Sequence, residues 1–151
     1  MEKRAKNRFL YFLILSLWIL FIFSNSLRPG DASNAQSTEV TGSLNDLLAL
    51  FGGSFSLSSA LVRALAHVGE FFVLGALLSV SAPVFQRYSA SYLLCTSLIG
   101  IGAALVDESI QYFVPGRSMS PADIVLDTVG SALGFWLLTT ILLFWKRKQK
   151  L

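Results

Sequence analysis

Ionisable side chains recur at helical spacing within an apolar stretch of the sequence. Arg63, His67 and Glu70 stand at offsets of 0, 4 and 7, which places them within about 60° of one another on an α-helix. Imidazole and carboxylate groups held together can act as general acid and base, as a nucleophile with its orienting acid, or as ligands of a divalent metal. The stripe therefore predicts a polar site or a buried ion-pair network.

A second polar stripe follows further along the chain. Gly100, Ala104, Asp107 and Gln111 stand at offsets of 0, 4, 7 and 11, with Glu108 about a quarter-turn to one side. At helical periodicity these residues share one face. That face is small at its start and polar at its end.

A third stripe begins at a capping sequence. In Ser120-Pro121-Ala122-Asp123, a serine N-cap, a proline at the first helical position and an acid at the third predict the start of a helix. Asp123 therefore has a structural explanation beside a functional one. On the same face Gly130 and Gly134 form a small-xxx-small pattern, typical of closely approaching helices, so Asp127 is expected to face protein rather than lipid.

The three stripes are expected to converge in the outer half of a membrane, because successive membrane-spanning helices run in opposite directions. The turn at Pro115-Gly116 would hold Arg117 over the same place. The candidates for catalysis are His67, Glu70, Asp107 and Glu108. The full set predicted to line an outward-open binding pocket is Arg63, His67, Glu70, Asp107, Glu108, Gln111, Arg117, Asp123 and Asp127.

This set carries an excess of negative charge, with five acids against two arginines. Arg63 could pair with Glu70, since intramembrane charges pair as a rule. Arg117 could pair with Asp107 or Asp123. The remaining acids would be costly if dry, and water, shared protons, a metal ion or a cationic ligand would relieve them. One imidazole with several carboxylates permits Zn²⁺, Mn²⁺ or Mg²⁺, although a single His excludes an H-x-x-x-H pair.

The composition indicates what surrounds these residues. Of 151 residues, 54% are apolar and only 14% are charged, whereas a soluble domain of this size carries about 25% charged residues. The length fits one domain, taken as residues 1–151. Basic residues bracket the apolar runs instead of interleaving with aromatics over one face, which argues against nucleic-acid binding. An integral membrane protein is the first expectation.

Four segments approach the roughly 20 residues that a helix needs to cross a bilayer, at about 9–27, 58–80, 89–110 and 122–145. The predicted fold class is an all-α membrane protein of four transmembrane helices. Nine of the twelve Lys/Arg lie near the chain ends and in the turn 81–88, so the positive-inside rule places both termini in the cytoplasm. A cleavable signal over the first segment is the alternative. An uncleaved span is favoured, because no clear small-x-small cleavage site ends the run.

The first outer segment, about 28–57, is predicted to be a polar loop because it is rich in Ser, Gly, Asn and Asp. Its one apolar cluster, from Leu44 to Phe51, is too short to span a bilayer. We expect a short helix there, lying in the outer interface or dipping back into the protein. Trp145 beside the basic tail indicates an interfacial anchor, whereas Trp18 and Trp136 could equally be lipid-facing aromatics.

Four short motifs together resemble one known family. They are Ser24-Asn25-Ser26, Arg63-x-x-x-His67-x-x-Glu70-Phe71, Asp107-Glu108-x-x-Gln111-x-Phe113-x-Pro115-Gly116-Arg117 and Asp123-x-x-x-Asp127-x-x-Gly130-x-x-x-Gly134. The combination resembles the VanZ-like family of small bacterial membrane proteins, named after a protein associated with teicoplanin resistance. The resemblance covers most of the chain, and the third motif is the most specific. Phe71 stands where the pattern leads us to expect Tyr, and Asp127 where the family also accepts Asn.

The resemblance implies a multi-pass protein of the bacterial cell membrane that contributes to tolerance of teicoplanin-type lipoglycopeptides. Its pocket would bind an envelope lipid, a lipid-linked cell-wall precursor or the antibiotic, with Arg63 and Arg117 meeting phosphate or carboxylate groups. The alternative is a membrane-embedded enzyme acting on a lipid head group. His67 would then be base or nucleophile, with a metal or with the hydroxyl of Ser24 or Ser26. Transport is a third class, and four short spans would need to oligomerise to enclose a channel.

Overall fold

The computed structural model describes residues 2–53 and 55–148, and these residues form helices and connecting turns without a strand. The helices are α1 (Glu2–Ser26), α2 (Gly30–Leu50), α3 (Ser59–Ser79), α4 (Ser81–Phe85), α5 (Ala90–Tyr112) and α6 (Pro121–Lys148).

Four of the helical segments are long and apolar enough to cross a membrane. They are α1, α3 continued through α4, α5 and α6, with mean hydropathies of 2.0, 1.8, 1.6 and 1.6. The predicted four-helix architecture is therefore confirmed. The helices α1 and α5 extend beyond the predicted spans, since α1 begins at Glu2 instead of residue 9 and α5 continues to Tyr112.

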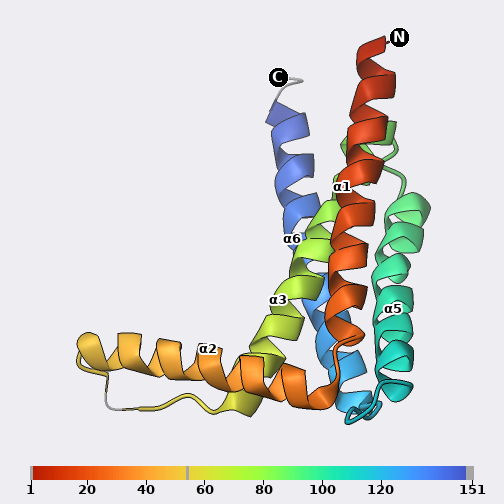
Figure 1. Cartoon of the computed structure of the whole chain (residues 1–151). Coiled ribbons are helices and arrows are strands. Elements are labelled where there is room, and N and C mark those ends of the chain that lie inside the picture. The colour runs from red at the N-terminus through yellow and green to blue at the C-terminus, as the bar shows by residue number, and fades with distance from the viewer. Residues whose placement is uncertain (1, 54, 149–151) are drawn as a thin grey trace.

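The start of α1 and the end of α6 lie at one end of the bundle, together with α4 (Figure 1). The helix α2 lies at the opposite end and runs across the bundle rather than along it (Figure 1). We call this opposite end the α2 end. The assignment of the other end to the cytoplasm stays a prediction from the positions of the basic residues.

The helix α2 corrects the prediction of a polar loop. The predicted short apolar cluster is only the last part of a helix of 21 residues. Its hydroxyl side chains bond back to carbonyl groups one turn earlier, as in Ser37 Oγ to Ser33 O at 2.9 Å and Thr41 Oγ1 to Ser37 O at 2.6 Å. Such bonds satisfy the hydroxyl groups within the helix, so a composition that is also typical of loops is compatible with one.

The closest helix packing joins α3 to α6 through glycines. A Cβ atom on Gly130 would lie 2.5 Å from the Val68 carbonyl oxygen, and one on Gly134 would collide with the Phe72 carbonyl. On the other side, a Cβ atom on Gly75 would collide with the Ser131 carbonyl. The predicted small-xxx-small contact is thus confirmed, and it brings the two backbones together where α3 carries its polar stripe.

An apolar core lies between the helices, and its fully buried members include Ile22, Phe71, Leu74, Leu78 and Phe135. Phe71 therefore belongs to the core, where a tyrosine hydroxyl would need a hydrogen-bond partner. Trp18 also faces protein, contrary to a purely lipid-facing reading. Its Nε1 donates a hydrogen bond of 3.0 Å to the Glu70 carbonyl, which ties α1 to α3.

Candidate functional site

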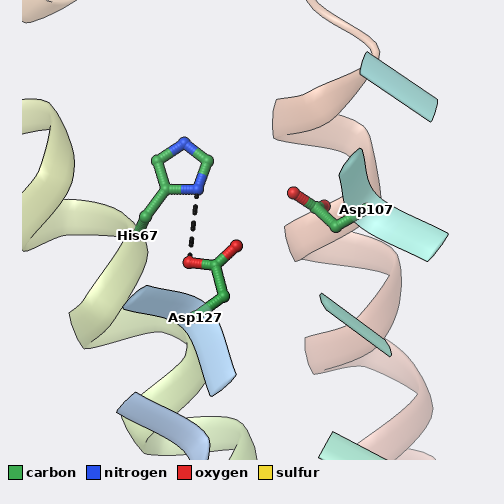
Figure 2. A group of neighbouring side chains, drawn as sticks. All are labelled: His67, Asp107 and Asp127. Carbon is green, nitrogen blue, oxygen red and sulfur yellow. Dashed lines mark ion pairs between the residues drawn. The ribbon is translucent and has the colours of Figure 1, made fainter. Parts of the chain in front are cut away.

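Three ionisable side chains from three helices meet towards the α2 end of the bundle. They are His67 on α3, Asp107 on α5 and Asp127 on α6. His67 Nδ1 lies 3.6 Å from Asp127 Oδ1, a distance that makes an ion pair but exceeds a hydrogen bond. Figure 2 shows the imidazole ring beside Asp127 and the Asp107 carboxylate facing both from α5. Both aspartates are fully buried, whereas the His67 side chain keeps 17% of its surface exposed.

Asp107 is held by two further side chains. Ser26 Oγ donates to its Oδ1 at 2.5 Å, and Gln111 Nε2 donates to its Oδ2 at 2.8 Å. Ser26 is therefore engaged by Asp107 and not by His67. Ser24 is exposed and donates to the Phe21 carbonyl at 2.8 Å. The alternative of a Ser-His-acid arrangement through either serine is therefore wrong for this structure.

The two glutamates flank this cluster, and each has a partner from another segment. Glu70 Oε1 accepts a hydrogen bond of 2.9 Å from Asn25 Nδ2. Glu108 is fully buried, and its Oε2 accepts one of 2.8 Å from the Ser120 backbone N–H. Ser120 Oγ in turn accepts a bond of 3.3 Å from the Asp123 N–H, which confirms the predicted N-cap. Glu108 thereby fixes the start of α6.

A cavity of about 410 Å³ lies beside the cluster, between α2, α3 and the turn before α6. Its wall includes five of the predicted pocket residues, Arg63, His67, Gln111, Arg117 and Asp123. A smaller cavity of about 130 Å³ shares His67 and both arginines and adds Asn25 and Glu70. We call His67, Asp107 and Asp127 the acidic cluster. His67 is the member of this cluster that lines both cavities.

The two arginines are not paired with acids in the described part of the chain, which corrects the predicted ion pairs. Arg63 Nη1 donates to Asn34 Oδ1 at 3.1 Å, and Arg117 Nη2 donates to Ser33 Oγ at 2.6 Å. The only ion pair among residues 2–53 and 55–148 is that of His67 with Asp127. Both guanidinium groups therefore meet neutral side chains of α2.

Arg117 keeps unused hydrogen-bond donors. Its Nε and Nη1 atoms are buried and find no acceptor among the described residues. Burial, followed by the neighbouring charge of Arg63, lowers the pKa of the Arg117 guanidinium. The turn that carries Arg117 places Gly116 at φ +75, a conformation that favours glycine. A positive group is therefore held against a second positive group at the cavity wall.

The cavity wall also contains residues of α2 that we did not predict, namely Asn34, Ser37 and Thr38. Asn34 and Thr38 are four residues apart, as are Ser33 and Ser37, and this spacing is a helical signal. Reading that spacing as a polar helix face would have found them.

Comparison with known proteins agrees with these motifs. The chain matches the family model described as VanZ/LLP1 over residues 9–144, which is most of its length. No curated protein and no solved structure matches it. The matched region contains all four membrane-length helices in large part, as well as the acidic cluster and both arginines. The chain therefore belongs to the VanZ/LLP1 family.

Proposed function

We propose that this multi-pass protein of the bacterial cell membrane contributes to tolerance of teicoplanin-type lipoglycopeptides by binding an anionic group in the cavity beneath α2. The group would be a phosphate or carboxylate of an envelope lipid, of a lipid-linked cell-wall precursor or of the drug. The observation that supports this most directly is that Arg63 and Arg117 line one cavity without an ion-pair partner among the described residues.

Two neighbouring guanidinium groups repel each other, and their repulsion is relieved when an anion lies between them. Arg117 Nε and Nη1 have no acceptor among the described residues, and a planar guanidinium binds phosphate or carboxylate oxygens in pairs. The hydroxyl and amide groups of α2 supply further donors at the same wall. A volume of about 410 Å³ falls within the range of ordinary ligand sites and suits a head group.

The location of the cavity also suits a lipid head group. A helix that lies across a bundle end, as α2 does, is typical of the interface between membrane and water. The basic residues at the other end favour an outer location for α2. Asp123 on the cavity wall would meet an amine of a zwitterionic head group or of the drug.

The test replaces Arg117 with alanine and uses Arg87→Ala as the matched control. Arg87 lies at the opposite end of the bundle, with its guanidinium 5.9 Å from the Tyr92 ring centre. In a susceptible host that expresses equal amounts of each protein, we expect R117A to lose tolerance to teicoplanin and R87A to keep it. Full tolerance with folded R117A would contradict the proposal.

The source of the anion is distinguished by binding to the purified protein in nanodiscs. Phosphatidylglycerol, a lipid-linked cell-wall precursor and teicoplanin are each added to a neutral bilayer. Binding that depends on Arg117 identifies the source. If none of the three binds in an Arg117-dependent way, the binding proposal is wrong.

A second candidate function is an enzyme that acts on a lipid head group. It is favoured by the pairing of His67 with Asp127, because a His held by an acid and open to a cavity is the arrangement of a general base. Mass spectrometry of nanodisc lipids after incubation tests it. No released head group, or equal release by the His67→Gln variant, would dismiss it.

A further inference from the structure

The acidic cluster has the composition of a metal site. Its ligand-type atoms, one each from His67, Asp107 and Asp127, all lie within 4.8 Å of one another. The three residues come from α3, α5 and α6, so the site exists only in the folded bundle. One imidazole nitrogen and two carboxylate oxygens are donors that divalent transition metals accept.

Asp127 carries the clearest sign that a ligand belongs there. It is fully buried, and neither of its carboxylate oxygens receives a hydrogen bond from the described residues. Its nearest positive partner, His67 Nδ1, is 3.6 Å away and is itself without a hydrogen bond. A buried carboxylate without donors is strongly unfavourable. Apart from the 3.6 Å approach of His67, Asp127 therefore has no polar partner among the described residues.

The Asp107 carboxylate is held in position by hydrogen bonds, but it can still accept a further ligand. Ser26 and Gln111 each give one hydrogen bond to one of its oxygens, and each oxygen has a second lone pair. Metal-binding carboxylates are held in this way by neighbouring donors, which fix their orientation. Gln111 also lines the larger cavity, so it lies between that cavity and Asp107.

We propose that His67, Asp107 and Asp127 bind one divalent cation, for which Zn²⁺ and Mn²⁺ fit the donor set. Two ligand atoms about 2.1 Å from a tetrahedral ion lie about 3.4 Å apart, close to the 3.6 Å between His67 and Asp127. Asp107 would approach by up to about 1.4 Å to complete the set, since the three ligand atoms lie within 4.8 Å of one another.

Three protein ligands leave a coordination position open. Of the three ligands, His67 is the one that lines both cavities. A cation at the cluster would place a positive charge beside the cavity that Arg63 and Arg117 line. The cation site deepens the proposed function, since it would add a third positive group for an anion, but its existence does not depend on that function.

The test measures metal on the intact protein without lipid ligand or drug. Protein purified in detergent without chelator is analysed for elements, stripped, and titrated calorimetrically with Zn²⁺ and with Mn²⁺. We expect one cation per chain and a loss of affinity of more than about 10-fold in Asp127→Asn, since even outer-shell changes cost that much. Asp46→Asn is the matched control, because Asp46 is an exposed carboxylate on α2 and lies outside the cluster; it should bind as the wild type does.

His67→Gln provides a second variant should D127N not fold, as judged by circular dichroism and gel filtration. The wild type should also gain thermal stability on addition of the cation, by the linkage of binding to folding. The proposal is overturned if the stripped wild type binds neither cation at millimolar concentration, or if folded D127N and H67Q bind as tightly as D46N. If the wild type binds the cation but the R117A variant keeps full tolerance, the proposed function is wrong and the metal site stands.

Discussion

The contact between α3 and α6 can be tested with a single methyl group. In Gly134→Ala, the added Cβ atom would collide with the Phe72 carbonyl, which belongs to the α3 backbone. A backbone group cannot rotate away as a flexible side chain can. The helices must therefore separate, and overpacking of this kind destabilises a protein by about 1–3 kcal/mol.

The matched control is Gly102→Ala on α5. This glycine is exposed, and a Cβ atom there would meet nothing within 4 Å. Alanine is the better helix former by about 0.8–1 kcal/mol, so G102A is expected to be stabilised slightly. The two variants make the same chemical change and gain the same helix propensity, so their free energies of unfolding should differ by the overpacking cost of G134A, about 1–3 kcal/mol.

The assay is reversible unfolding in mixed micelles, followed by circular dichroism, with all three proteins at equal detergent composition. Separation of α3 from α6 should also move His67 away from Asp127. G134A is therefore expected to bind divalent cation more weakly than G102A does. If G134A proves as stable as G102A, the close backbone contact is not a feature of the folded protein.

Three other substitutions test single interactions. Ser26→Ala removes the donor to Asp107 Oδ1 and should destabilise the fold by about 1–3 kcal/mol, as measured by the same unfolding assay; equal stability of S26A and the exposed-site variant S24A would contradict it. Ser120→Ala removes the N-cap of α6 and should cost about 1 kcal/mol, with the neutral cap of Ser120→Asn restoring the loss. Trp18→Phe removes the hydrogen bond to the Glu70 carbonyl and should cost about 0.5–1.5 kcal/mol, whereas Trp136→Phe, whose ring is exposed, should change stability little.

Periodicity predicted the parts of the structure that depend on one helix at a time. Asp107, Gln111 and Asp127 could be assigned to buried faces because helical geometry fixes which residues share a side. The cap at Ser120 was predictable for the same reason, since its hydrogen bond closes within one turn. These features need no knowledge of neighbouring helices.

The parts that depend on two helices were not predictable in the same way. Charge alone predicted an ion pair between Arg63 and Glu70. Instead, Arg63 donates a hydrogen bond to the neutral Asn34 of α2, and Glu70 accepts one from Asn25 of α1. Both partners come from segments distant in sequence. Because α2 was expected to be a loop, no helix face was available to supply Asn34. A one-helix argument cannot choose between such partners.

The glycines of α6 affect both the packing of α6 against α3 and the position of Asp127 in the site. Asp127, Gly130 and Gly134 share one face of the helix, and Gly130 packs against Val68, the residue next to His67. A slide of α6 by one residue would move Asp127 by about 1.5 Å along the axis and turn it by about 100°, while a Cβ-bearing residue would then occupy the place of Gly130. The close contact therefore excludes the shifted registers sterically. The same glycines that let the backbones meet also fix which acid faces His67, so packing and site chemistry are set by one sequence pattern.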